Sequence, residues 1–402
     1  MKVKIEPSIA RGEIEAPPSK SYAHRLLICS ALANGVSTVK GIINSKDMEA
    51  TLNCISALGV SFNCENDTVT VNSDGLHKNN DAAKFYCNES GSTLRFFIPI
   101  ALACGGINEF YGTERLLSRG LEVYEDICKK QGISIEKCKE KVVFNGQLQP
   151  DTFNVRGDIS SQFITGLLFA LPLLNGDSVI NITTNLESAG YVDITLDTLK
   201  QFGIEIKRDN NTFYIKGNQK YQSASVVVEG DMSNSAFLDA FNILGGDVSV
   251  LGLNPLSKQA DSVYAPMMVN LKYTSPTLDL SSCPDLAPIL FAISATQNGA
   301  EFTGTKRLKI KESDRATAMA QELKKFGIKV DVYENSVIVH KGELTKPTEM
   351  LYGHNDHRIV MALSVISSIY GGELDGCESV SKSYPDFFED IKKLGIKCEV
   401  TE

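Results

Sequence analysis

Apolar residues recur with helical spacing in six segments of the chain. Each segment has a polar start, about four turns of helical periodicity and a closing Asn-Gly or Gly-Gly pair. The glycines that close the segments are Gly35, Gly106, Gly176, Gly246, Gly299 and Gly372. Their spacing is about 70 residues, except for one interval of 53 residues that ends at Gly299. One repeating unit therefore runs through the whole chain.

A second periodic segment follows five of these six helices. It is a shorter amphipathic helix that ends at a glycine and leads into alternating apolar and polar residues, as in LKQFGIEIKRDNNTFYIKG. The alternation around the polar residues 209–211 predicts a β-hairpin. The glycines that end these helices are Gly59, Gly132, Gly203, Gly327 and Gly395, and their one double interval coincides with the short repeat. Each unit is therefore expected to be helix, strand, helix and hairpin, with short strands between.

The repeats predict a mixed α/β (α+β) fold with two similar domains. A unit of this kind cannot bury the face of its sheet alone, so several units are expected to pack around a shared interior. Three βαβαββ-type repeats around a pseudo-threefold axis would form each domain. Residues 18–229 are predicted to form the first domain. Residues 1–17 and 230–402 form the second, if the first strand, MKVKIEPS, returns to the second half.

Composition and charge narrow the class of protein. The chain is 43% hydrophobic and can bury a large core, and its length of 402 residues exceeds what one hydrophobic core usually supports. A formal net charge of −9 argues against a nucleic-acid binder, so any anion must be bound by local groups of cations. No apolar stretch reaches the roughly 18 residues of a membrane span, and the first residues lack the apolar core of a secretory signal. We therefore expect a cytoplasmic protein whose ten cysteines, without C-x-x-C spacing, are reduced.

The polar starts of the six helices are rich in residues that bind anions. The first contains Lys20 and Ser21, and a spacing of four places Ser21 and Arg25 on one helical face. The second, ESGSTLR, offers free backbone N–H groups, and Gly91 allows a phosphate or carboxylate to come close. These two starts favour an anion site.

Two further starts carry polar groups of other kinds. The third is Ser160-Ser161-Gln162, which suits a ligand with phosphate and alcohol groups, and the sixth is Asp356-His357-Arg358. Any one of these starts could be only an N-cap, for which serine and aspartate are good residues. Capping does not need the cations, however, and cations oppose the dipole at a helix N-terminus. Their joint presence favours bound anions.

Charged residues also gather between the fifth and sixth starts. Lys311, Glu312 and Arg315 lie within five residues, before an amphipathic helix, and could supply phosphate contacts and a proton carrier. The alternative is an exposed helix start with mutual ion pairs. Asp285 follows Pro284 at the fifth start and could be only the helix cap.

At these motifs the chain resembles the EPSP synthase family, over its full length and in the same order. PPSKSYAHR is similar to the family's lysine-serine signature, SGSTLR to its loop beside phosphoenolpyruvate, and CPDLAP and KESDR to the segments with its proton-transfer carboxylates. The resemblance implies transfer of the enolpyruvyl group of phosphoenolpyruvate to the 5-hydroxyl of shikimate 3-phosphate by addition and elimination. This step belongs to the shikimate pathway, which leads to chorismate and the aromatic amino acids. The family reaction needs no metal or other cofactor.

The resemblance also implies roles for individual residues. The catalytic residues would be Asp285 as base toward the 5-hydroxyl, and Glu312, assisted by Lys20, as proton donor to the methylene carbon. The residues that would bind shikimate 3-phosphate are Lys20, Ser21, Arg25, Ser160, Ser161, Gln162, Ser188, Tyr191, Asp285, Arg307 and Lys311. Those that would bind phosphoenolpyruvate are Lys20, Gly91, Arg119, Gln162, Arg315, His357, Arg358 and Lys382. Because the helix starts that bind anions come from both halves, the active site is expected in the cleft between the domains.

The sequence leaves two alternative functions open. One is the UDP-N-acetylglucosamine enolpyruvyl transferase family, which resembles the chain less, because its lysine-asparagine start and reactive loop cysteine have no counterpart here. The other is an anion-binding protein without activity, against which the retained Lys20, Asp285 and Glu312 argue. In either enzyme reading the partners are small-molecule substrates, with no nucleic acid or membrane, and the protein is expected to be a monomer.

Overall fold

The computed structural model describes residues 1–76 and 82–401. Contacts along the chain divide it into two compact units, Lys20–Glu229 and Met1–Ser19 with Gly230–Glu402. Among the residues described, no helix is both long and apolar enough to cross a bilayer.

The unit Lys20–Glu229 contains three sheets with one plan, in which a central strand pairs in parallel with one neighbour and in antiparallel with a hairpin. One repeat consists of β6 (Ala83–Tyr86), α3 (Gly91–Cys104), β7 (Ile107–Tyr111), α4 (Glu114–Leu117), α5 (Glu122–Gln131), β8 (Ser134–Lys137) and β9 (Lys141–Asn145). The next consists of β10 (Thr152–Val155), α6 (Ser161–Ala170), η1 (Leu171–Leu173), β11 (Ser178–Ile182), α7 (Ala189–Gln201), β12 (Ile206–Asp209) and β13 (Thr212–Ile215).

The first repeat of this unit is closed by strands from its far end. It contains α1 (Lys20–Leu32), β3 (Ala33–Lys40), α2 (Lys46–Ala57), β4 (Ser61–Glu65) and β5 (Thr68–Asp74). The parallel neighbours of β3 are β14 (Tyr221–Gln222) and β15 (Ser225–Val227). The last residues of the unit therefore complete the sheet of its first repeat.

The other unit contains two complete repeats. One has β17 (Thr277–Asp279), η3 (Pro284–Leu286), α10 (Ala287–Thr296), β18 (Ala300–Thr303), η4 (Lys306–Ile310), α11 (Arg315–Lys325), β19 (Val330–Val332) and β20 (Ser336–Val339). The other has β21 (Leu351–Tyr352), α12 (His357–Tyr370), β22 (Gly372–Asp375), η5 (Cys377–Lys382), α13 (Phe387–Lys393), β23 (Cys398–Thr401) and β1 (Lys2–Ile5). Val3 of β1 pairs with Leu374 on one side and Val400 on the other, so the predicted return of the first strand is confirmed.

The third repeat of this unit is short and lacks a hairpin. It contains β2 (Arg11–Glu15), α8 (Met232–Ile243), β16 (Asp247–Leu251), η2 (Ala260–Val263) and α9 (Tyr264–Tyr273), and its sheet is the parallel pair of β2 and β16. The carboxamide of Asn242 accepts from the Val248 N–H at 2.7 Å and donates to the Val248 carbonyl at 2.8 Å. In the other repeats a hairpin strand bonds to the backbone of the central strand. Here the side chain of Asn242 takes that place for the N–H and the carbonyl of Val248.

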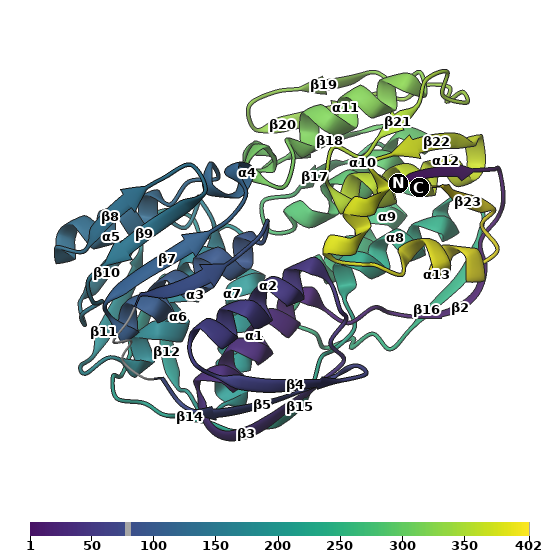
Figure 1. Ribbon diagram of the computed structural model, residues 1–402. Helices are drawn as coiled ribbons and strands as arrows, with labels where there is room; N and C mark the ends of the chain where they lie inside the picture. The colour runs from purple at the N-terminus through teal and green to yellow at the C-terminus, as the bar shows by residue number, and fades with distance from the viewer. Residues whose placement is uncertain (77–81, 402) are drawn as a thin grey trace. The chain divides into compact units, whose positions relative to one another are not determined.

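Helices fill the interior of each unit. Every residue of α10 from 287 to 295 is buried, as expected for a helix that is apolar on all sides. The second helices are amphipathic: α5 buries Val123, Tyr124, Ile127 and Cys128, which share one face. In the unit Lys20–Glu229, α1, α3 and α6 lie among the sheets, and α3 packs closely on α6 (Figure 1). The first turns of these inner helices carry most of the motifs found in the sequence.

The predicted helices, hairpins and short repeat are confirmed, but two of the glycines predicted to close helices lie in strands. The turn predicted between β12 and β13 contains Asn210 at a φ of 49°. Gly372 begins β22, and the C-cap of α12 is Gly371. Gly35 does not close a helix either: α1 ends at Leu32, and Gly35 lies within β3, paired with Ser73. Its φ of 113° suits a glycine within a strand, where a Cβ would approach the Ser223 hydroxyl to 3.1 Å.

Candidate active-site residues

In the unit Lys20–Glu229, the first turn of α1 is tied to the first turn of α2. Lys20 Nζ donates to Asp47 Oδ2 at 3.0 Å, and both side chains are mostly buried. Asp47 also lies in the acidic first turn of α2, where the helix dipole favours a negative charge. The pair holds the ammonium group of Lys20 in place at the start of α1.

Arg25 lies one turn further along α1 and is buried against α7. Its guanidinium donates to the Ser21 carbonyl at 2.7 Å, to Thr195 Oγ1 at 2.8 Å and to the Tyr191 carbonyl at 3.0 Å. All three acceptors are neutral. Burial lowers the pKa of Arg25 to about 10, so the group is still a cation at neutral pH. Three of the predicted shikimate 3-phosphate ligands therefore lie together.

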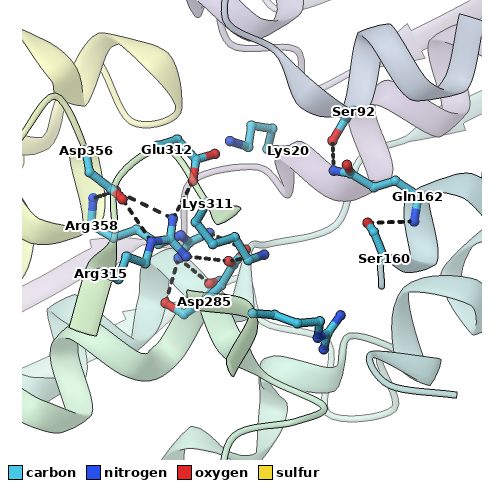
Figure 2. A network of polar contacts seen from close by, with 12 residues as sticks. Lys20, Ser92, Ser160, Gln162, Asp285, Lys311, Glu312, Arg315, Asp356 and Arg358 are labelled. Atoms are coloured by element: carbon cyan, nitrogen blue, oxygen red, sulfur yellow. Dashed lines mark hydrogen bonds and ion pairs between the residues drawn. The ribbon is translucent and has the colours of Figure 1, made fainter. Parts of the chain in front are cut away.

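The start of α3 lies against Arg119. A Cβ atom on Gly91 would come within 2.7 Å of Arg119 Nη1, so a larger residue would push this guanidinium away. Arg95, one turn into α3, donates to the Arg119 carbonyl at 2.9 Å and to Gln162 Oε1 at 2.7 Å. Gln162 Nε2 in turn donates to Ser92 Oγ at 3.0 Å (Figure 2). Gly91, Arg119 and Gln162, predicted for phosphoenolpyruvate, are thus brought together.

Two more helix starts in this unit carry predicted ligands. Ser160 caps α6 by accepting from the Gln162 N–H, and Ser161 is buried in the first turn. Ser188 precedes α7 in the left-handed conformation, at a φ of 56° and a ψ of 41°, with its carbonyl accepting from the Tyr191 N–H. A left-handed serine is uncommon and is often found where a site requires it.

In the other unit, Asp285 accepts from three cations. Lys311 Nζ lies 3.1 Å and Arg315 Nη1 2.7 Å from Oδ1, and Arg358 Nη2 lies 3.1 Å from Oδ2 (Figure 2). Burial alone would raise the pKa of Asp285, but the three cations outweigh burial and hold its pKa well below the usual range. Asp285 is therefore a carboxylate at neutral pH, and its contacts are ionic.

Arg315 is the centre of this cluster. Besides Asp285, it donates to Glu312 Oε2 at 2.9 Å and through Nε to Asp356 Oδ2 at 2.9 Å. Burial would lower the pKa of Arg315, but these carboxylates raise it well above its usual value. Only 1% of its side chain is exposed, so the alternative of an exposed helix start is wrong for Arg315, although the ion pair with Glu312 that it included is present.

The remaining predicted residues of this unit lie around the start of α12 and in η4. Asp356 caps α12 through the Arg358 N–H, and His357 is buried beside it. Lys382 Nζ donates to the Asn355 carbonyl at 2.7 Å, directly before that cap. Arg307 is buried and donates to the Ser281 carbonyl in the loop before Asp285.

Comparison with known proteins gives the chain its family. A family model described as EPSP synthase (3-phosphoshikimate 1-carboxyvinyltransferase) matches residues 6–391. The chain belongs to the EPSP synthase family. A 3-phosphoshikimate 1-carboxyvinyltransferase from Clostridium kluyveri is 41% identical over 417 residues, covering 98% of this chain and 97% of its own. One from Clostridium novyi is 42% identical over 426 residues, with the same coverage.

Solved structures share the fold of this EPSP synthase family member. EPSP synthase from Acinetobacter baumannii matches over 100% of both chains with a TM-score of 0.80 and 23% identity. The enolpyruvyl transferase NikO from Streptomyces tendae covers 100% of this chain and 98% of its own, with a TM-score of 0.77 and 14% identity. The α/β fold predicted from the repeats is thereby confirmed.

Several buried polar residues at these family motifs were not singled out by the sequence. Asp47 and Thr195 contact Lys20 and Arg25, but each lies on another helix, with no local charge pattern to mark it. Ser233 accepts from Arg358 across 125 residues of sequence. The sequence marks Asp356 only as the start of a helix. Its position directly before His357-Arg358 is the one local feature that could have indicated a role in pairing with a distant arginine.

Within the described parts of the chain, no three His, Cys, Asp or Glu side chains are grouped so as to hold a metal ion.

Proposed function

We propose that this member of the EPSP synthase family transfers the enolpyruvyl group of phosphoenolpyruvate to the 5-hydroxyl of shikimate 3-phosphate, releasing phosphate. The observation that carries the proposal is full-length identity of about 40% to curated 3-phosphoshikimate 1-carboxyvinyltransferases. The buried cations and carboxylates described above supply the groups that such a reaction requires.

The reaction has two steps. The 5-hydroxyl oxygen of shikimate 3-phosphate bonds to C2 of phosphoenolpyruvate while C3 gains a proton, which gives a tetrahedral phosphate ketal. Loss of a proton from C3 then expels phosphate and restores the double bond. We assign Asp285 as the base toward the 5-hydroxyl and Glu312, assisted by Lys20, as the proton donor to C3. With the proton flow reversed, the same groups serve the second step.

The charge around Asp285 supports this assignment. Its carboxylate is bound by Lys311, Arg315 and Arg358, which are also assigned to the anionic substrates. Phosphate and carboxylate groups of bound substrates would compete for these cations, and exclusion of water would remove solvation from the carboxylate. Both effects raise the pKa of Asp285 and make it a better base once substrates are bound.

We assign the ligands by group. In Lys20–Glu229, the proposed ligands of shikimate 3-phosphate are Lys20, Ser21, Arg25, Ser160, Ser161, Gln162, Ser188 and Tyr191, and in the other unit they are Asp285, Arg307 and Lys311. Phosphoenolpyruvate is assigned to Lys20, Gly91, Arg119 and Gln162, with Arg315, His357, Arg358 and Lys382. Orientation of two reactants by such contacts can contribute about 7–11 kcal/mol to lowering a barrier.

The decisive experiment measures phosphate release from phosphoenolpyruvate with shikimate 3-phosphate or with UDP-N-acetylglucosamine as acceptor. We expect turnover with shikimate 3-phosphate alone. Folded protein that releases no phosphate with this acceptor would refute the proposal, and turnover with the nucleotide sugar would favour the other transferase family. Absence of turnover with both, together with tight binding of shikimate 3-phosphate, would indicate an anion-binding protein.

We further propose that the protein acts as a cytoplasmic monomer on small molecules alone, with residues 18–229 and residues 1–17 with 230–402 as its two domains. The net charge of −9 supports the absence of nucleic-acid partners. Sedimentation at micromolar concentration should give one species near the chain mass of 43.8 kDa. A dimer at that concentration would contradict the proposal.

A further inference from the structure

A chain of buried polar side chains links three helices of the unit Lys20–Glu229. His24 Nδ1 lies 2.7 Å from Thr51 Oγ1, which lies 2.9 Å from Thr93 Oγ1. Thr93 Oγ1 donates to Ser90 Oγ at 2.7 Å. All four residues are buried, and they come from α1, α2, α3 and the N-cap of α3. A continuous line of polar contacts therefore runs through the interior of the unit.

The hydroxyl groups fix the tautomer of His24. The proton of Thr93 is used in its bond to Ser90, so Thr51 must donate to Thr93. Thr51 then has no proton left for His24, and the imidazole must donate from Nδ1. All the hydroxyl protons therefore point in one direction, from His24 toward Ser90.

This chain joins two sets of groups that the proposed function assigns to phosphoenolpyruvate. Lys20 and His24 lie one turn apart on α1, and their partners Asp47 and Thr51 lie one turn apart on α2. Two hydrogen-bonded pairs, Lys20–Asp47 and His24–Thr51, therefore join α1 to α2 on successive turns. At its other end the chain reaches Ser90, which caps α3 directly before Gly91. The chain therefore fixes the position of the start of α1 relative to the start of α3.

Stability alone does not account for this arrangement. In the described chain, His24 Nε2 is buried and has no hydrogen-bond partner, and such a group costs free energy that an apolar side chain would not. Burial, and then Lys20 and Arg25, lower the pKa of His24 well below 6.5, so the ring is neutral at physiological pH. His24 is therefore a buried, neutral imidazole with one ring nitrogen unpaired among the described residues.

We propose that His24 is a positioning residue that aligns Lys20 with the Gly91 start of α3 for binding phosphoenolpyruvate. The inference rests on the proposed function, since it is that function which assigns Lys20 and Gly91 to this substrate. Arg25, assigned to shikimate 3-phosphate, is held through separate bonds to α7. Lys20 is assigned to both substrates and Gly91 to phosphoenolpyruvate alone, so loss of the chain is expected to weaken binding of phosphoenolpyruvate more than binding of shikimate 3-phosphate.

The first test compares His24→Leu with His24→Asn, whose side-chain amide can still donate from near the position of Nδ1. We expect His24→Leu to raise the KM for phosphoenolpyruvate about tenfold, which corresponds to one lost hydrogen bond, and to raise the KM for shikimate 3-phosphate by a clearly smaller factor. His24→Asn should restore most of the loss. Ser30→Ala is the control, because Ser30 is a buried hydroxyl on the same helix that bonds only within it, to the Leu26 carbonyl.

Two outcomes would overturn the proposal. One is a His24→Leu variant with a lower melting temperature but unchanged KM for phosphoenolpyruvate. The other is an equal rise in both KM values, since a general disturbance of the unit would affect both substrates. Ser90→Ala combined with His24→Leu provides an independent measure: a shared chain predicts that their effects on the KM for phosphoenolpyruvate are less than additive, and additivity would contradict it.

The test is separable from the proposed function. Folded wild-type protein without turnover would refute the function itself, whereas an active wild type with unaffected variants refutes only the role of His24. The ¹⁵N chemical shifts of the His24 ring are independent of activity. They should show a proton on Nδ1, and a proton on Nε2 would contradict the directed chain.

Discussion

Arg25 and Arg315 are buried arginines in different units, and their surroundings are opposite. Among the described residues, the hydrogen-bond acceptors of Arg25 are neutral oxygens of Ser21, Tyr191 and Thr195, and burial lowers its pKa to about 10. Arg315 donates to three carboxylates, which raise its pKa well above the usual value despite burial. Within the described parts of the chain, Arg25 is not ion-paired, whereas Arg315 is paired with carboxylates of its own unit.

The difference indicates that the surroundings of Arg25 and Arg315 serve different roles. An uncompensated buried cation favours an incoming anion, because the anion supplies the charge that the protein lacks. A cluster in which carboxylates already bind cations is suited to transferring protons, because anionic substrates change the pKa values of its members. The contrast between Arg25 and Arg315 can be tested by substitutions on each side.

The largest effect is expected on turnover, for a substitution among the carboxylates that contact Arg315. Glu312→Gln should reduce turnover about 10²- to 10⁴-fold, the usual contribution of a general acid, while binding of shikimate 3-phosphate is nearly unchanged. The matched control is Asp314→Asn, two residues away, because asparagine is as good an N-cap for α11 as aspartate. Steady-state kinetics and titration calorimetry measure the two quantities. Equal activity of Glu312→Gln and wild type would remove Glu312 from the mechanism.

Next in size is a difference in stability between two matched substitutions. Arg315→Met should lower the free energy of unfolding by about 3–5 kcal/mol, because it leaves buried carboxylates without their partner. Arg25→Met should lower it by less than about 2 kcal/mol, because only neutral acceptors lose a donor. Urea unfolding of both variants measures the difference. Similar losses in the two variants would contradict the contrast.

Arg25→Met should also weaken binding of shikimate 3-phosphate by about 10- to 100-fold. A hydrogen bond between a charged donor and an anion contributes about 1.5–3 kcal/mol, and methionine fills similar space without the charge. Calorimetric titration of the ligand measures the change, with Arg208→Met as a control, since Arg208 is a surface arginine paired with Asp193. Unchanged affinity would mean that Arg25 serves only to join α1 to α7.

The smallest effect is confined to acid pH. The pKa of Asp285 is depressed in the folded protein, so its contacts stabilise fully above about pH 3.8, its usual pKa, and are lost as pH falls through the folded value. The stability difference between wild type and Asp285→Asn should therefore shrink below about pH 3.8. The difference between wild type and Arg25→Met should stay constant there, because no partner of Arg25 titrates. Unfolding at a series of pH values tests both, and the reverse pattern would contradict the assignment.

Sequence periodicity predicted most of the fold because each repeat is locally encoded. Amphipathic helices and alternating hairpins leave a pattern in neighbouring residues, and even the missing hairpin was visible as a shorter interval. The strand that closes a sheet from a distance leaves no such pattern. The residues of β15 lie 187 positions from their partners in β3, and three residues are too few to show a period.

The sequence identified many residues of the candidate site but few of the contacts between them. Lys20, Arg25 and Arg315 were recognisable because cations at helix starts are unusual, and Glu312 because it lies between Lys311 and Arg315 in a short charged segment. Their partners were not, because Asp47, Thr195 and Asp356 are chosen by packing between helices far apart in sequence. The alternative of Asp285 as a simple cap could be rejected only when three cations were found around its carboxylate.

The pairing of β1 has a consequence for how the polypeptide is made. Lys2 pairs with Thr401, so β1 must wait for the synthesis of about 400 further residues before this pairing can form. At about 5–20 residues per second, this interval lasts on the order of 20–80 s on the ribosome. The segment Lys20–Glu229 is complete well before then and can fold during translation. The nascent chain must meanwhile keep β1 from pairing with the edges of other strands.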